Sequence, residues 1–363
     1  MTDRKLFAPD VIEKDGKYYL YAYIVGSKGV VGVSDKPEGP FKLLSQYKYD
    51  PEDAGDDGIY NDAGVLVDDD GRVYIYYGFT ESNFNEIDPA DMYTIKKGSY
   101  KRAVIDDSDN APQEQRFFEA SSPRKIGDTY YLIYSPCVGS RLAYATSDKP
   151  QGPFKYRGYI IDNGVDYPGG NDHGSVCDIN GQWYIFYHRH TNGTWYSRQG
   201  CAERLTFGED GSIFQAEITS CGLNGGPLVG EGYYPAYLAC NLFTNEPSIY
   251  VDERFPKIMQ DGRDGDEDPA YLGAIVDGTT VGFKYFDMKN IHQISIDVRG
   301  YIKGSFEVKT AWDGKVLAQI PVEYTNVWKH YSTPVDMPDG VQALYFTFKG
   351  EGKGSLKGFY LEH

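Results

Sequence analysis

The stretch DAGVLVDDDGRVYIYY, residues 62–77, decides how this chain is built. Its Asp70-Gly71 step predicts a two-residue hairpin turn, because Gly and Asx residues adopt positive φ at little cost. Apolar, β-branched and aromatic residues on both sides of the turn are typical of antiparallel strands. We therefore expect residues 62–77 to form a β-hairpin.

Three further stretches follow the same plan, and they open at Phe7, Glu119 and His173. Successive openings lie 54 to 57 residues apart, and each is followed by a small residue and later by an aromatic strand-like run. The pair of motifs Ser-Asp-Lys-Pro and Gly-Pro-Phe-Lys also occurs twice, at residues 34–42 and 147–155, two repeats apart. Repeats of this length in strand-forming residues predict the blades of a β-propeller.

The opening residues are the candidates for function. The innermost strand of a propeller blade faces the central cavity, so Phe7, Asp62, Glu119 and His173 should converge there. The small residues behind the openings are alike, whereas the openings themselves differ in chemistry. Two carboxylates facing one pocket are the equipment of glycoside hydrolysis. The alternative is that Asp62 and Glu119 are ordinary solvated surface acids.

On these motifs the chain resembles glycoside hydrolase family 43 over about residues 5 to 228. The resemblance implies a five-bladed β-propeller that hydrolyses arabinosides and xylosides with inversion. It also implies that Glu119 is the general acid, that Asp62 serves pKa tuning and orientation, and that His173 lies on the axis. Phe7 would begin the second blade.

The resemblance further implies the groups that bind substrate. The run Arg-Gln-Gly-Cys-Ala-Glu-Arg-Leu at residues 198–205 looks like the closing motif of the family, whose first Arg reaches the sugar. Arg198, Phe7 and His173 are therefore the expected substrate-binding residues. No cofactor is required, but the axial His of some members contacts calcium through water, which makes His173 a candidate site for a structural calcium ion.

The chain departs from the family in one respect. Four blades are visible, and the missing first blade is the one that carries the general-base Asp. The nearest acids are Asp3 and Asp10, and strand alternation from Phe7 predicts that the Asp10 side chain points away from the axis. The sequence is a truncated version of a longer chain, or the blade comes from elsewhere, or catalysis has been lost. We favour truncation.

Residues 229–363 differ in character from the propeller domain predicted for residues 1–228. After a Gly-rich linker, short alternating strands separated by Gly, Asp-Gly and Pro turns predict a β-sandwich. The segment Asn-Val-Trp-Lys at 326–329 resembles a family 6-type carbohydrate-binding module. Trp312 or Trp328 would then stack on sugar, and the alternative is that both belong to the core. The predicted fold is thus all-β, a propeller followed by a sandwich.

One acidic run resembles a calcium loop in composition. Its spacing lacks the Glu at position twelve of the helix-loop-helix pattern, so a solvated interdomain loop is the favoured interpretation. The run comprises Asp261, Asp264, Asp266, Glu267 and Asp268.

Composition excludes several classes of partner. The formal charge of −17 argues against nucleic acid and against an anionic membrane surface. No apolar run approaches 18 residues, and the N-terminus lacks a signal-peptide core. The five cysteines lack metal-ligand spacing and predict free thiols in a reducing cytosol, with secretion left open because the start of the chain is predicted to be truncated. Nothing in the sequence indicates an oligomeric state.

The predicted function is an inverting exo-glycosidase that releases arabinofuranose, xylose or both from plant cell-wall oligosaccharides of the arabinoxylan type. The alternative is a non-catalytic carbohydrate-binding or scaffold protein, because the general-base Asp is absent. The presence of both Asp62 and Glu119 favours the enzyme, since a pure binding protein has no need for a buried acid. Whether these 363 residues alone are active is left open.

Overall fold

The computed structural model describes residues 5–24, 28–55, 58–105, 111–166, 172–246, 248–261 and 270–363, with only the backbone at 165 and 166. Asp3 and the acids at 264–268 therefore lie outside the described residues. The chain forms two compact units. The first comprises Met1–Asp162, Asn171–Asp178 and Thr206–Gln215, and the second comprises Asn163–Gly170, Ile179–Leu205 and Ala216–His363.

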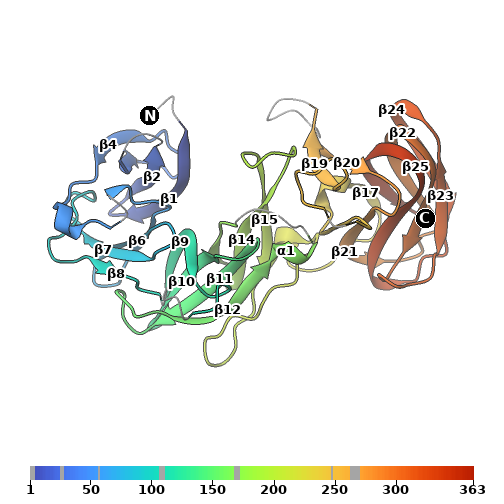
Figure 1. Ribbon diagram of the computed structural model, residues 1–363. Coiled ribbons are helices and arrows are strands. Elements are labelled where there is room, and N and C mark those ends of the chain that lie inside the picture. The colour runs from blue at the N-terminus through green and yellow to red at the C-terminus, as the bar shows by residue number, and fades with distance from the viewer. Residues whose placement is uncertain are drawn as a thin grey trace. The chain divides into compact units, whose positions relative to one another are not determined.

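The first three repeats each fold into a four-stranded antiparallel sheet, drawn from blue to green in Figure 1. In each sheet every strand pairs with the next one in sequence, so the repeats are simple meanders. Their strands are β1 (Leu6–Lys14), β2 (Lys17–Ile24), β3 (Val30–Ser34) and β4 (Lys42–Gln46); β5 (Gly64–Val67), β6 (Val73–Tyr77), β7 (Asn83–Ile87) and β8 (Lys101–Arg102); β9 (Phe117–Ile126), β10 (Thr129–Pro136), β11 (Arg141–Ser147) and β12 (Lys155–Asp162).

The fourth repeat supplies β13 (Ser175–Ile179), β14 (Gln182–His190) and β15 (Arg198–Arg204). Among the described residues the only α-helix is α1 (Asn163–Asp166), and three short 3-10 turns occupy Pro51–Asp53, Gly222–Asn224 and Ala236–Leu238. No helix in these ranges has the length and apolar character needed to span a bilayer. The chain is therefore all-β, with four small sheets in repeat order as in a β-propeller.

The hairpin predicted from residues 62–77 forms, but its turn is longer than expected. Val67 pairs with Val73, so five residues rather than two connect the strands. Within this turn the Asp68 N–H donates to the carbonyl of Arg72 at 2.8 Å. The Asp68 carboxylate accepts hydrogen bonds from Lys125 Nζ at 2.6 Å and from the Tyr130 hydroxyl at 2.5 Å. Lys125 and Tyr130 belong to the next sheet, so the turn residue Asp68 is drawn into the contact between sheets.

Tyrosine rings fill the layers between the sheets of the first unit. Tyr21, Tyr60 and Tyr77 are fully buried between the first and second sheets, within one apolar cluster. The hydroxyl of Tyr21 donates to the carbonyl of Met92 at 2.9 Å, and that of Tyr77 donates to Asn85 Oδ1 at 2.7 Å. Tyr21 and Tyr77 thus contribute apolar area to the layer and satisfy their hydroxyls within the protein.

The first strands of neighbouring repeats approach each other closely. Asp10 in β1 accepts the backbone N–H of Val65 in β5 at 2.8 Å, through Oδ2. A Cβ added to Gly64 would lie 2.2 Å from the carbonyl oxygen of Ser121 in β9. Arg124 in β9 donates from Nε to the carbonyl of Val176 in β13 at 2.8 Å. Side chains therefore satisfy backbone groups at the edges of these sheets, where no further strand pairs with them.

The remaining strands of the second unit form one large mixed sheet. They are β16 (Leu228–Val229), β17 (Gly232–Pro235), β18 (Asn241–Phe243), β19 (Lys257–Gln260), β20 (Ala270–Ile275), β21 (Thr280–Met288), β22 (Gln293–Lys309), β23 (Ala318–Val322), β24 (Thr325–Pro334) and β25 (Gly340–Glu362). Phe283, Phe346 and Phe359 are fully buried and in mutual ring contact at the centre of its apolar core.

Two of these strands are longer than the sequence predicts. The pattern indicates separate strands on each side of the glycines near 300 and near 352, whereas β22 and β25 run through them and pair along their length. Gly300 lies opposite Gly354, and a Cβ on Gly300 would come within 2.7 Å of the Gly354 Cα. These glycines therefore permit close approach of two strands and do not end them.

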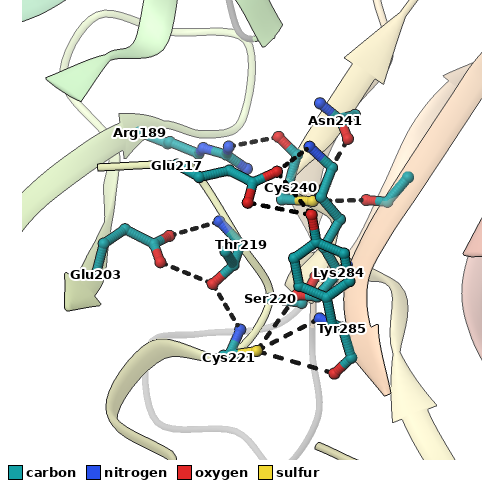
Figure 2. A network of polar contacts seen from close by, with 11 residues as sticks. Arg189, Glu203, Glu217, Thr219, Ser220, Cys221, Cys240, Asn241, Lys284 and Tyr285 are labelled. Atoms are coloured by element: carbon teal, nitrogen blue, oxygen red, sulfur yellow. Dashed lines mark hydrogen bonds and ion pairs between the residues drawn. The ribbon is translucent and has the colours of Figure 1, made fainter. Parts of the chain in front are cut away.

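A polar network within the second unit connects the fourth repeat to the C-terminal sheet (Figure 2). Arg189 of β14 donates to the carbonyls of Ala239 at 2.5 Å and Cys240 at 2.6 Å. Ser220 donates its N–H to the carbonyl of Lys284 in β21 at 2.5 Å. The predicted domain boundary near residue 228 assigns β14 and β15 to the propeller, and it stays a prediction.

Glu203 of β15 is the titratable group of this network with a strong shift. Its carboxylate accepts hydrogen bonds from the N–H and the hydroxyl of Thr219, both at 2.7 Å (Figure 2). Burial raises the pKa of Glu203 to about 7, although the bonds from Thr219 and the charge of Arg189 partly oppose the rise. The folded protein therefore holds a proton on Glu203 at pH values where the unfolded chain has released it.

We expect the stability of the protein to fall as pH rises from about 4.5 to about 7. Below this window both states carry the proton, and within it only the folded state does, so the free energy of unfolding decreases by about 3 kcal/mol across it. Glu203→Gln cannot titrate and keeps an acceptor for the Thr219 N–H. Urea unfolding at several pH values should show a flatter profile for this variant, and identical profiles would contradict the assignment.

We also expect Asp10→Ala to destabilise the first unit, because it leaves the buried N–H of Val65 without its acceptor. An unsatisfied buried donor costs about 1–3 kcal/mol. Burial raises the pKa of Asp10, so a neutral acceptor of the same shape should be tolerated, and Asp10→Asn is the matched control. Chemical denaturation measures both variants. Equal losses for Ala and Asn would show that the hydrogen bond to Val65 contributes little.

Candidate active site

Three of the four opening residues meet in the first unit. His173 Nε2 lies 3.4 Å from Asp62 Oδ2 and 3.4 Å from Glu119 Oε1. One polar atom from each of the three side chains lies within 4.8 Å of the others. Asp62 is buried, and the side chains of Glu119 and His173 are 12% and 30% exposed. The cluster is therefore largely shielded from water, with its widest access at the histidine.

A β-bulge follows the opening residue in two of the repeats. In β1 the pairing passes from Phe7 to Asp10 while one residue of β2 is passed over, so Ala8 and Pro9 face one partner. In β9 the pairing jumps from Glu119 to Ser122 in the same way. Bulges occur beside functional sites because they re-aim the adjoining side chain. The same device thus sets the direction of Phe7 and of Glu119.

Left-handed backbone conformations accompany these openings. Ala8 has φ 38°, Ala120 has φ 70°, and Asp62 itself has φ 48°. Non-glycine residues rarely adopt this region, and such conformations cluster at functional sites. Asp62 lies two residues before β5, whose second residue, Val65, is bound by Asp10. This hydrogen bond therefore holds the start of the strand that follows Asp62.

The bulge also changes what can be inferred about Asp10. The sequence argument placed its side chain by strict alternation from Phe7, and the extra residue in β1 interrupts that alternation. In the structure the Asp10 carboxylate accepts N–H groups from Val65 at 2.8 Å and from Val11 at 2.9 Å. Asp10 thus connects two neighbouring repeats, a role that its position in the sequence does not indicate.

His173 is positioned through its neighbour. Asp172 is fully buried and donates its backbone N–H to Ser135 Oγ at 3.5 Å. Ser135 is the residue of β10 that pairs with Glu119 in β9. The segment that begins at His173 is therefore held against the strands β9 and β10 at the position of Glu119. Sequence reasoning missed Ser135 and Asp172, and the only available signal was that Asp172 directly precedes an opening.

The two carboxylates change the acidity of the imidazole. Burial alone would lower the pKa of His173, but the hydrogen bond with Glu119 and the negative charges of Asp62, Glu119 and Asp172 outweigh it, so the pKa is raised. A protonated His173 offsets the repulsion between two acids held close together. The cluster therefore favours a positive charge between its carboxylates.

These three side chains form the one cluster of potential metal ligands found among the described residues. Calcium takes six to eight oxygen ligands, and two carboxylates and an imidazole supply few of them. The donor set therefore does not fit direct calcium binding by His173. What the arrangement can supply is proton transfer, from a shielded acid beside a second carboxylate and a titratable imidazole.

The other two predicted substrate-binding residues are not brought into this cluster by any described contact. Phe7 is 37% exposed and stacks on Tyr23, with ring centroids 6.2 Å apart. Arg198 lies in the second unit at the start of β15, where its Nε is 3.3 Å from His188 Nε2. Their contacts with a sugar stay predictions.

Comparison with known proteins places this site in a family context. Residues 1–213 match the model described as glycosyl hydrolases family 43. A xylosidase/arabinosidase of Thermoclostridium stercorarium is 46% identical over 392 residues, covering 98% of this chain and 82% of that protein. A beta-xylosidase of Xylanibacter ruminicola is 31% identical over 58% of this chain and 74% of its own length.

Solved structures agree with the sequence comparisons. The crystal structure of a family 43 beta-xylosidase/alpha-arabinofuranosidase from a compost microbial metagenome, a calcium-free form in complex with xylotriose, is similar with a TM-score of 0.50. It is 31% identical and covers 58% of this chain and 73% of that one.

We expect Asp62→Asn to lower the pKa of His173, because it removes one of the negative charges that favour the imidazolium. Glu119→Gln should act in the same direction. The chain has six histidines, so the His173 signal in an NMR pH titration is assigned with His173→Gln. An unchanged His173 titration in both variants would show that the carboxylates do not interact with the ring.

Proposed function

Because the chain belongs to glycosyl hydrolases family 43 and is a glycosidase, we propose that it releases xylose or arabinofuranose from the ends of arabinoxylan-type oligosaccharides, with inversion. The observation that carries the proposal is the shielded pair Asp62 and Glu119 beside His173. The relative from T. stercorarium, whose printed name is xylosidase/arabinosidase, supports the choice of sugars.

Glu119 is the proposed general acid. The leaving alcohol departs when its glycosidic oxygen receives the Glu119 proton as the bond from that oxygen to the anomeric carbon breaks. Water attacks the anomeric carbon from the opposite face, and its proton goes to the general-base Asp that the family resemblance assigns to the first blade. The position of Glu119 supports this role, since its side chain is only 12% exposed and lies beside Asp62 and His173.

Asp62 serves a different purpose. An inverting acid and base stand roughly 6.5–9.5 Å apart to leave room for the attacking water. Oxygens of Asp62 and Glu119 lie within 4.8 Å, which is too close for that arrangement. Asp62 is therefore proposed to orient the acid and to set the charge around it, in agreement with the raised pKa of His173 between them.

The finer architectural and binding assignments are also proposals. The four small sheets would belong to a five-bladed type of propeller, and the C-terminal sheet would be a β-sandwich of the family 6-type carbohydrate-binding module. Arg198, Phe7 and His173 would contact the sugar, Arg198 as a donor and Phe7 as an apolar wall. Calcium would reach His173 only through water, and no step depends on it.

We expect Glu119→Gln to reduce hydrolysis of xylosides and arabinofuranosides with poor leaving groups by about 100- to 10,000-fold, the usual contribution of a general acid. Activated aryl glycosides should lose less, because their leaving groups depart without a proton. The exposed Glu38 provides the matched control, Glu38→Gln. Initial rates on both substrate types measure the effect.

Two outcomes would contradict this assignment. Equal losses on both kinds of substrate would show that Glu119 is not the proton donor. An anomer of retained configuration, seen by NMR directly after cleavage, would show that Asp62 acts as a nucleophile, since retaining pairs stand only about 5–5.5 Å apart.

A further inference from the structure

A second pocket lies in the C-terminal sheet, where the register of two strand pairs is irregular. Between β22 and β24, Val298 pairs with Lys329 and Gly300 pairs with Thr325. Residues 326–328 of β24 therefore lie opposite the single residue Arg299 of β22, and this stretch departs from regular strand pairing. Asn326, together with the adjoining Tyr324 and Thr325, forms one wall of a cavity of about 350 Å³.

The opposite side of the cavity has an irregularity of its own. Between β20 and β25, Leu272 pairs with Leu356 and Ile275 with Gly354, so two residues of β20 face Ser355 alone. Ala274, one of those two, has φ 61° and lines the cavity. Irregular pairing on both sides of one cavity is the pattern of a shaped site, because bulges recur where strands border a binding site.

The floor of the cavity is the glycine pair of the two long strands. Gly300 and Gly354 both line it, and they lie opposite each other in β22 and β25. Gly300 has φ 127°, and a Cβ there would also approach the Lys353 carbonyl oxygen to 2.8 Å. Only glycine fits this position, and its lack of a side chain keeps the floor open to a ligand.

Two tyrosines stand at the rim. Tyr301 is 74% exposed and Tyr324 is 51% exposed, and their ring centroids are 4.2 Å apart. Adjacent aromatic rings in contact with water are a typical mark of a ligand surface, because a ligand that covers them gains apolar contact. Trp328, which the sequence suggested as a stacking residue, has the Arg299 guanidinium over its ring at 4.4 Å. That face is already occupied.

The charge of the cavity is opposite to that of the chain. The described residues that line it include Arg299 and Lys353 and no carboxylate, in a protein of net charge −17. Arg299 forms an ion pair with Asp261. The side chain of Lys353 is exposed and makes no hydrogen bond or ion pair with the residues that the structure describes, and the same holds for the side chain of Asn326. Lys353 is thus available for an anionic group, and Asn326 for hydroxyls.

We propose that this pocket binds an oligosaccharide that carries a uronic acid. In this proposal the sugar rings pack on Tyr301 and Tyr324. Asn326 forms hydrogen bonds with the hydroxyls of the sugars, and Lys353 binds the carboxylate of the uronic acid. The choice of a glycan rests on the proposed function, whereas the carboxylate follows from the exposed lysine and from the lack of acids among the described lining residues. The pocket would hold the enzyme on acid-substituted regions of its polymer.

The test is calorimetric titration of the full chain carrying Glu119→Gln, which slows hydrolysis of the probe during the measurement. The probes are a xylo-oligosaccharide bearing one glucuronic acid and the same oligosaccharide without it. The acidic probe should bind more tightly, and Tyr301→Ala should weaken its binding by about tenfold, the scale of one lost aromatic contact. Lys353→Gln should remove the difference between the two probes.

Matched controls come from the same unit. Tyr196→Ala removes a tyrosine that is 73% exposed and lies outside the pocket, and Lys349→Gln removes an exposed lysine of β25 outside the lining. Neither should change the affinity. Thermal unfolding of each variant shows that it is folded.

The proposal is overturned if the chain that carries only Glu119→Gln binds the two probes with equal affinity. It is also overturned if adding Tyr301→Ala or Lys353→Gln leaves the affinity for the acidic probe unchanged. Rates of glycoside hydrolysis by the chain with Glu119 intact test the proposed function separately. If the chain does not hydrolyse glycosides but binds the acidic probe selectively, the proposed function is wrong and the proposed pocket stands. If it hydrolyses glycosides but does not distinguish the two probes, the proposed pocket is wrong and the proposed function stands.

Discussion

The first unit depends on how closely the first strands of its repeats approach one another. Each of these strands is an edge of its own sheet, so its outer N–H and C=O groups have no partner strand. The protein satisfies such groups with side chains, as Asp10 does for Val65 and Arg124 does for Val176. Gly64 permits the contact by presenting no side chain to Ser121. Docking of separate sheets therefore requires specific polar and small residues as well as apolar layers.

The active-site geometry follows from that docking. Because β5 and β9 are in close contact, Asp62 and Glu119 are brought within reach of each other and of His173. Two acids this close repel one another when both are ionised, and the imidazole between them reduces that cost. The resulting cluster combines a proton donor with fixed charges around it, so the reactive group and its electrostatic environment come from three different repeats.

The sequence predicted the periodic part of this structure and missed the irregular part. Repeat spacing predicted that Asp62, Glu119 and His173 lie close together, and the structure confirms this for these three openings, whereas no described contact joins Phe7 to them. The bulge after Phe7 gave no signal, since its left-handed residue is Ala8 rather than Gly. The sequence pattern predicts turns at the glycines near residues 300 and 352, because close approach of two strands and a chain reversal both call for glycine.

The bulge after the opening residue appears in β1 and again in β9, with a phenyl ring at one opening and a carboxylic acid at the other. The backbone bulge thus sets the direction of the opening side chain, whatever residue type stands at that position. Gene duplication followed by single substitutions is enough to diversify such a protein, because a duplicated bulge keeps its backbone geometry whichever residue precedes it. New chemistry on this scaffold would need few changes, and those changes would fall at one position per sheet.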